Sequence, residues 1–231
     1  MLHCNKKSKN CVASECSPSQ HLPEGWTCVT LGELLKTLSD YHANGSYVTL
    51  KNHVTLLDNP DYALMIRATN FEKRDFEINA KYITQDAYEF MEKSKLFGGE
   101  ILIGKIGNAG KVYLMPDLGR PCSLAMNLFL LRCCTCISNK YVFYHLLSQE
   151  SEAELRSNVK GVGNPSIDKA SVRSVHIALP PLAEQKRIVE EVERRLSVVE
   201  ELESLVTTNL QRATRLRQSI LQKAFEGKLV V

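Results

Sequence analysis

A glycine-rich loop between two predicted strands is the first place in this sequence where chemistry could occur. Residues 104–111 carry Lys105, Asn108 and Lys111 and contain no acidic residue. Glycine lets the backbone approach a ligand closely, lysine suits phosphate groups, and asparagine can pair bidentately with adenine. The loop therefore predicts contact with nucleic acid, and a plain hairpin with solvated lysines is the alternative.

The same loop does not match a nucleotide-binding phosphate loop. Five residues, instead of four, separate Gly104 from Gly110, and Val112 stands where serine or threonine would bind magnesium. Nucleotide binding is therefore not expected here.

A second basic and polar segment covers residues 156–167. It contributes four candidate contacts with DNA: Arg156, Lys160, Asn164 and Ser166. Residues 164–167 read Asn-Pro-Ser-Ile, a near miss for the Asn-Pro-Pro-aromatic motif with which amino-methyltransferases hold an extruded base. The second proline and the stacking aromatic residue are missing, so the sequence predicts no methyltransferase activity in this chain.

A third candidate follows a predicted buried strand. Arg67 and Asn70 provide the two side-chain types that most often pair with base edges. Together with Asn108, Asn164 and Ser166 they are our candidates for base reading, whereas the lysines and Arg156 are expected to contact phosphates. A structural arginine followed by an asparagine turn explains Arg67 and Asn70 equally well.

No catalytic or metal-binding constellation emerges from the sequence. His145 and His176 lie in apolar surroundings, and no carboxylate pair or Ser-His-Asp set is evident. The nearest approach to metal-ligand spacing, Cys133 with Cys136, closes an apolar run that looks like strand. We expect no catalytic residue, no metal and no cofactor in this chain.

The elements that must position these residues predict an α+β fold. Short apolar segments alternate with turns, which favours a curved mixed or antiparallel sheet with short helices. Strands are expected at residues 27–30, 47–50, 63–68, 100–103, 111–114 and 175–179. Helices are expected at residues 31–38, 84–95 (with Thr84 as the N-cap), 141–148 and 150–155.

The 231 residues suffice for one well-packed domain with an extension. We expect a disordered leader over residues 1–21, a globular domain over 22–179 and a helical region over 180–231. No apolar run is long enough to span a bilayer, so no membrane partner and a cytoplasmic location are expected. The net charge of +3 leaves any argument for a nucleic-acid partner to the local clusters.

A long helix is predicted after Pro180 and Pro181. Residues 182–226 contain neither proline nor glycine, and Gly227 provides a C-cap signal. Such a helix would be about 67 Å long, far more than a compact domain needs. Apolar residues recur every three or four positions and predict a coiled-coil seam at Val189, Val192, Leu196, Val199, Val206, Leu210, Ala213 and Ile220.

Charge along this helix gives the pairing a direction. Residues 182–205 contain seven Glu against four Lys or Arg, and residues 206–231 contain one Glu against five Lys or Arg. An antiparallel second copy would place the acidic half against the basic half, so the sequence favours antiparallel pairing. A helix that packs on its own domain is the alternative.

Three segments resemble the specificity subunit of type I restriction–modification enzymes. They are Leu-Pro-Glu-Gly-Trp at 22–26, Gly-Glu-Ile-Leu-Ile-Gly-Lys-Ile-Gly at 99–107, and Leu-Pro-Pro-Leu-Ala-Glu-Gln-Lys-Arg-Ile-Val at 179–189 before the long helix. The resemblance covers residues 22–231. It implies a target recognition domain that binds one half of a split site in double-stranded DNA, followed by a helical spacer.

The same resemblance implies partners. A methyltransferase subunit that holds S-adenosylmethionine is expected to dock on the helical region, and a motor nuclease subunit can join. Full-size members hold two such units, so this single unit is expected to work as a half-size subunit, either as a homodimer or with a second half-subunit, or to be half of a longer gene product. The competing function is a coiled-coil assembly module that does not read DNA sequence.

Overall fold

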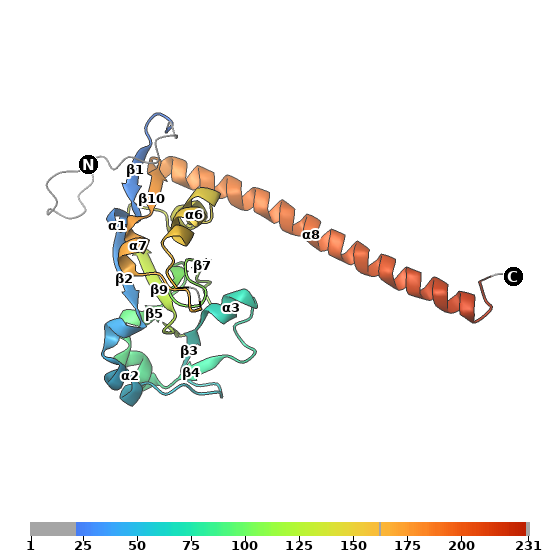
Figure 1. The fold of residues 1–231 in the computed structure, drawn as a ribbon, viewed down its shortest axis with the longest axis horizontal. Helices are drawn as coiled ribbons and strands as arrows, with labels where there is room; N and C mark the ends of the chain where they lie inside the picture. Colours follow the sequence, from blue (N-terminus) through green and yellow to red (C-terminus); the bar gives the residue numbers. More distant parts are fainter. Residues whose placement is uncertain (1–21, 162, 230–231) are drawn as a thin grey trace. The chain divides into compact units, whose positions relative to one another are not determined.

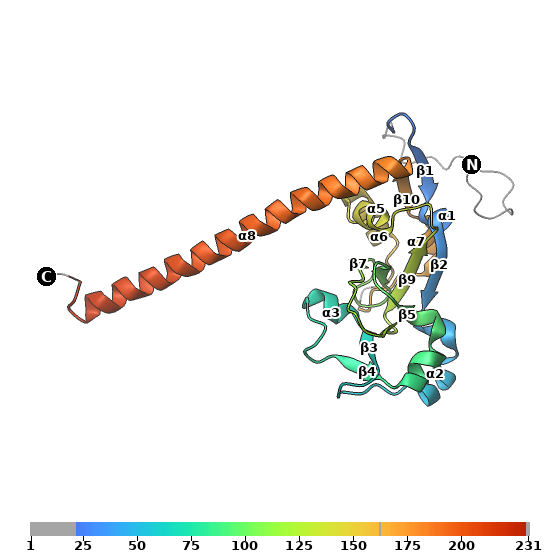
Figure 2. The ribbon, with the colours of Figure 1, turned by 180° about the vertical axis from the view of Figure 1, so that it is seen from behind.

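The computed structural model describes residues 22–161 and 163–229, so the predicted leader lies outside the described residues. The chain divides into two compact units, one up to Lys186 and one from Arg187. The predicted α+β class is confirmed, and the strands are distributed over three sheets instead of one (Figures 1 and 2).

An antiparallel sheet forms the centre of the first unit. Its order is β2-β9-β6-β7. The strands are β2 (Leu35–Asp40), β9 (Leu128–Cys133), β6 (Ile101–Gly104) and β7 (Val112–Leu114). β9 is buried from Leu128 to Leu131, because it has neighbours on both sides and packs on both faces.

A second sheet has mixed directions. Its order is β4-β3-β8-β5, and β3 pairs in parallel with β8. The strands are β4 (Lys81–Ile83), β3 (Ala63–Ile66), β8 (Cys122–Leu124) and β5 (Lys95–Leu96). The third sheet is an antiparallel pair, β1 (Thr27–Thr30) with β10 (His176–Leu179).

Short helices connect and cover these sheets. They are α1 (Leu31–Leu34), α2 (Tyr47–His53), α3 (Ala68–Glu72), α4 (Gln85–Phe90), α5 (Asn139–Leu146), α6 (Gln149–Ser157), α7 (Lys169–Ser174) and the 3₁₀ turns η1 (Tyr41–Asn44) and η2 (Glu92–Ser94). The predicted N-cap of α4 is confirmed, since the Thr84 hydroxyl accepts from the Ala87 N–H.

Two local predictions were wrong, and the helix predicted over 84–95 is shorter than expected, because α4 ends at Phe90 and Lys95 lies in β5. Residues 47–50 form the start of α2 instead of a strand, because Ser46 caps the helix by accepting from the Thr49 N–H. The helix predicted over 31–38 ends at Leu34, where the chain enters β2 and pairs with β9. Pairing with a distant strand overrode the local preference in this second case.

The core has two layers that share β3. Leu64 and Ile66 pack with Leu102 of β6 and Leu130 of β9 in the cluster between the two larger sheets. Ala63 and Met65, which point the other way along the strand, pack in the cluster that α2 and α4 cover. β3 is therefore buried on both faces, as its continuous apolar sequence requires.

The long C-terminal helix is confirmed as α8 (Leu182–Phe225), 44 residues without interruption. Its first turn is anchored in the first unit by Gln185, which is 1% exposed and bonds to the Ser138 N–H and the Pro180 carbonyl. Beyond the helix, Gly227 adopts φ 71° and its N–H donates to Ala224, as expected for a C-cap. The predicted seam is exposed only in part. Val189 is 7% exposed and Val192 is half-buried, so Val189 does not belong to an open face, whereas the seam residues from Leu196 onward are exposed, from 44% at Ile220 to 68% at Leu210.

A nearly buried carboxylate ties three segments of the first unit together. Asp40, at the end of β2, accepts from the ammonium groups of Lys105 and Lys169, each at 2.8 Å. The Asp40 side chain is 8% exposed, and both ammonium groups also lie over the Phe129 ring. Burial alone would raise the pKa of Asp40, but the hydrogen bonds and positive charges of the two lysines hold it below its ordinary value.

We expect Asp40→Asn to lower the free energy of unfolding at pH 7 by about 2 kcal/mol, because two partly exposed ammonium groups lose their counter-charge. The pKa of Asp40 is lower in the folded state than in the unfolded state, where it is about 3.9. Its contribution to stability is therefore complete at pH values above about 3.9 and is lost as the pH falls through the folded-state pKa. Urea unfolding at pH 7 and pH 3 should therefore show a difference between the variant and the parent that shrinks at pH 3. Glu92→Gln, at an exposed carboxylate, is the control. A difference of equal size at both pH values would contradict the assignment.

Candidate nucleic-acid interface

The parallel pair of strands decides where the candidate residues meet. β3 and β8 run in the same direction, so both end at one edge of their sheet. The Ala125 N–H donates to the Ile66 carbonyl at 2.9 Å, which joins the two exits. Ligands commonly bind beyond the carboxyl ends of parallel strands, because the following loops converge there.

The glycine loop is brought to the same edge by the neighbouring sheet. Gly104, the last residue of β6, is paired with Leu128 at the start of β9, and the Lys105 N–H donates to the Asn127 carbonyl at 2.8 Å. A Cβ on Gly104 would lie 1.9 Å from the Asn108 carbonyl oxygen, so glycine is required at this position. The loop therefore folds back tightly against the strand that it follows.

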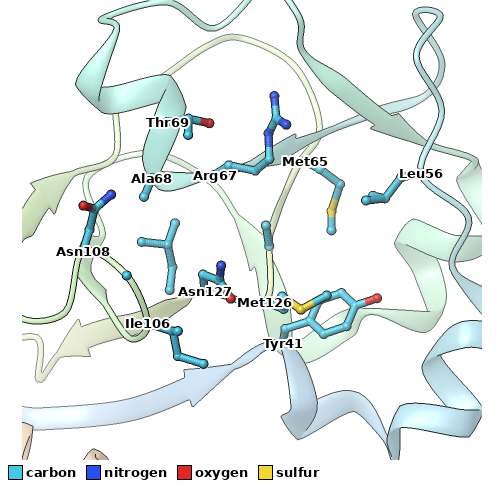
Figure 3. Close-up of a pocket in the computed structure, with 13 residues that line it drawn as sticks. Tyr41, Leu56, Met65, Arg67, Ala68, Thr69, Ile106, Asn108, Met126 and Asn127 are labelled. Carbon is cyan, nitrogen blue, oxygen red and sulfur yellow. The ribbon is translucent and has the colours of Figure 1, made fainter. Parts of the chain in front are cut away.

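A pocket of about 570 Å³ lies where these strand ends converge (Figure 3). Arg67, Thr69, Asn108 and Asn127 supply its polar lining. Leu56, Met65, Met126 and Tyr41 supply much of its apolar lining. Of the predicted site residues, the structure brings Arg67 and Asn108 to this pocket.

The Arg67 side chain is held at the rim by one hydrogen bond. Its guanidinium donates to the Asn79 carbonyl, while the Nε atom is buried and has no hydrogen-bond partner. A buried donor without a partner costs free energy. A ligand acceptor that bonds to this donor would recover that free energy, which favours binding. Arg67 thus remains a candidate for base reading.

Asn70 has a different environment from the one that base reading needs. It is 3% exposed, its Oδ1 accepts from the Arg67 N–H at 2.9 Å, and its Nδ2 donates to the Asp75 carbonyl at 3.0 Å. Both polar atoms are engaged in holding the start of α3. Asn70 is therefore better explained by its contacts at the start of α3, which agrees with the alternative of a structural arginine followed by an asparagine turn.

The two predicted loops lie against each other. The Gly107 N–H donates to the Pro165 carbonyl at 2.9 Å, and the Ile167 N–H donates to the Lys105 carbonyl at 3.0 Å. A β-bridge between Ile106 and Ser166 lies between these two bonds. This backbone pairing therefore joins the glycine loop and the 156–167 segment into one surface.

The cationic side chains differ in how available they are. Lys105 is 22% exposed and bound to Asp40, so its role in the structure is to fix the loop. Lys111 is 60% exposed beside Glu72, and Lys160 is 78% exposed at 3.6 Å from Asp168. Arg156 is 73% exposed and paired with Glu152. Exposed ion pairs contribute little free energy, so these three can exchange their partners for phosphates.

The remaining two candidates lie in the 156–167 segment. Asn164 is exposed, and Ser166 is half-buried and exchanges both backbone hydrogen bonds with Lys160. Neither lines the pocket. Both nevertheless belong to the joint surface of the two loops.

Thr69, Asn127, Met126 and Tyr41 line the pocket and were missed by sequence reasoning. Each lies within a few residues of a strand end, which is the signal that could have found them. The order of strands in the sheets, which makes those ends adjacent, was not available from the sequence.

The histidines have structural partners. The Ala178 N–H donates to His145 Nε2 at 3.1 Å, and His145 Nδ1 lies 3.0 Å from the Ser151 hydroxyl. Burial lowers the pKa of His145, which favours the neutral ring that accepts this bond. His176 Nδ1 lies 2.8 Å from a carboxylate oxygen of Glu154. These contacts hold α5 and α6 against β10.

The described part of the chain offers neither a metal site nor a membrane-spanning helix. Within residues 22–161 and 163–229, no group of three or more His, Cys, Asp or Glu side chains could hold a metal ion. Among the same residues, no helix has the length and apolar character needed to cross a membrane.

Comparisons with known proteins agree on one family. A family model described as the type I restriction modification DNA specificity domain matches residues 23–206. The chain is similar to the EcoBI specificity subunit of Escherichia coli, at 25% identity over 71% of this chain and 35% of that protein. It is similar to the MjaVIII specificity subunit of Methanocaldococcus jannaschii, at 25% identity over 88% of this chain and 43% of that protein.

Solved structures share the fold. The HsdS subunit from Thermoanaerobacter tengcongensis matches with a TM-score of 0.61 and 23% identity, over 92% of this chain and 48% of that one. A chain from a study of complex assembly in the type I R-M system matches with a TM-score of 0.69 and 23% identity, over 93% of this chain and 49% of that one. The chain spans less than half the length of these relatives. Because the family model extends over most of the globular unit and into α8, the chain belongs to the type I restriction modification DNA specificity domain family.

Proposed function

We propose that this chain is a non-catalytic specificity subunit that binds one half of a split site in double-stranded DNA and directs methyltransferase and restriction subunits to it. The observation that carries the proposal is the family match over residues 23–206. The joint surface of the two loops supports it, because Lys111, Lys160 and Arg156 are exposed there beside the pocket that Arg67 and Asn108 line. Lysine and arginine at the surface suit phosphates, and Arg and Asn suit base edges.

The catalytic cofactor is assigned to a partner. We propose that S-adenosylmethionine binds to the methyltransferase subunit, which docks on the helical region, and that this chain supplies sequence recognition only. The chain's own Asn-Pro-Ser-Ile segment at 164–167 lacks the aromatic residue that would stack on a target base.

The second part of the proposal concerns α8. Its exposed seam favours an antiparallel helix from a second copy or from another half-subunit, because burying the apolar side chains is favourable and the acidic half would then face the basic half. A symmetric pair relates two recognition units by a two-fold axis, so a homodimer would read two inverted half-sites at a fixed spacing.

Selection from a random duplex library tests sequence recognition. We expect the full chain, alone or with its methyltransferase subunit, to enrich one bipartite sequence with a constant gap. The competing function, a coiled-coil assembly module, predicts that no sequence is enriched. A pool that stays random under both conditions would therefore reject the proposed function.

Salt dependence tests the phosphate contacts. We expect Lys111→Ala to reduce the slope of log affinity against log salt concentration by about 0.9, since one phosphate contact is lost. Lys160→Ala should act similarly. Lys51→Ala, at an exposed position on α2, is the control and should leave the slope unchanged. Unchanged slopes for both test variants would remove the two loops from the phosphate-binding surface.

Sedimentation tests the pairing of α8. We expect the parent chain to be a dimer and the double variant Leu196→Asp, Leu210→Asp to have half its mass, because two carboxylates would be buried in the seam. Replacing the outward-facing Gln211 and Gln218 with Asp is the matched control. A double seam variant that sediments like the parent would refute self-association through this face.

A further inference from the structure

The pocket beyond the ends of β3 and β8 is a concave cavity and not a flat surface. Its volume of about 570 Å³ lies within the range of about 300–1,000 Å³ typical of sites for small molecules. Five strand ends and the loops beside them enclose it, so its shape is set by the core and not by one loop. A cavity of this kind fits a compact group that enters it.

Its lining combines polar and apolar side chains. Figure 3 shows Leu56, Met65 and Tyr41 on one side, and Thr69 and Asn108 with the apolar Ala68 and Ile106 on the other, with Arg67 and Asn127 between them. A matching ligand has apolar faces and a hydrogen-bonding edge. Nucleobases have this character, because their faces stack and their edges carry donors and acceptors.

Arg67 provides an independent indication of a ligand. Its bond to Asn79 fixes the guanidinium, yet its buried Nε donor has no partner. An apolar side chain from a protein partner would leave this donor unpaired. An acceptor on the edge of a base would satisfy it, which favours a base over an apolar peptide group.

The mouth of the pocket also suits an unstacked base. Leu56 and Met126 are 50% and 47% exposed although both are large and apolar. Exposed apolar side chains can replace the stacking that a base loses when it leaves its neighbours in DNA.

We propose that the pocket accepts a single nucleobase that leaves the stack of the recognised DNA. Arg67 and the Asn127 amide hydrogen-bond its edge, Asn108, whose side chain also bonds to Glu72, lies beside it, and Tyr41 and Met126 contact its face. The inference rests on the proposed function, because it concerns DNA that the chain already binds. It adds a contact made by extrusion to those made in the grooves.

The test uses the duplex that the full chain selects from a random library. In a series of duplexes, the partner of each base in turn is replaced by an abasic residue, so that the cost of unpairing is removed at one position. We expect one position to bind about tenfold more tightly than the paired duplex, which corresponds to about 1.4 kcal/mol. 2-Aminopurine placed at that position in the paired duplex should change its fluorescence when the chain binds.

Thr69→Phe should block the pocket without altering the core, because Thr69 is exposed on α3. The ratio of the affinity for the unpaired duplex to the affinity for the paired duplex should then be within about twofold of 1. The change in 2-aminopurine fluorescence should be lost. Thr135→Phe is the matched control. Thr135 is exposed and follows the C-terminal end of β9, whereas Leu128, at the other end of this strand, lines the pocket. It should retain the preference and the signal.

The outcomes separate the two proposals. In one outcome, the chain selects a sequence but binds it equally well whichever position is unpaired, and the 2-aminopurine fluorescence does not change. This result overturns the extrusion of a base and leaves DNA recognition intact. A preference that survives Thr69→Phe places the extruded base elsewhere and overturns the pocket's role. A library without any enriched sequence overturns the proposed function and this inference with it.

Discussion

Parallel pairing of β3 with β8 is the constraint on which the rest of the first unit depends. It makes the exits of two strands adjacent, although about sixty residues separate them in the chain. The neighbouring antiparallel sheet adds the end of β6 and the start of β9 at the same place. A pocket lined by both polar and apolar side chains is the consequence.

Asp40 shows how the fold uses charge near this site. Its carboxylate binds two lysines that come from different segments, so Lys105 fixes the glycine loop and Lys169 fixes the start of α7. Lysines that look alike in the sequence thereby take different roles. Lys105 is held by Asp40 and is mostly covered, whereas Lys111 and Lys160 stay exposed.

The two units contribute different kinds of recognition. The globular unit presents loops whose backbones are paired with each other, which suits contact with a ligand of defined shape. The helical unit exposes apolar side chains from Leu196 to Ile220 that would be favourable to bury against another helix. The proposed function places recognition of DNA in the globular unit and the spacing between two such units in the helical unit.

The sequence by itself determined the elements whose causes are local. α8 follows from a repeat of three and four residues between Pro181 and Gly227, and most strands follow from short apolar runs. The tertiary structure decided which polar side chains stay available. Asn70 and Lys105 have the residue types of a DNA contact, but a neighbouring turn engages the first and a carboxylate 65 positions away engages the second. Hydrogen bonding and burial depend on such partners, so residue type and spacing could not reveal them.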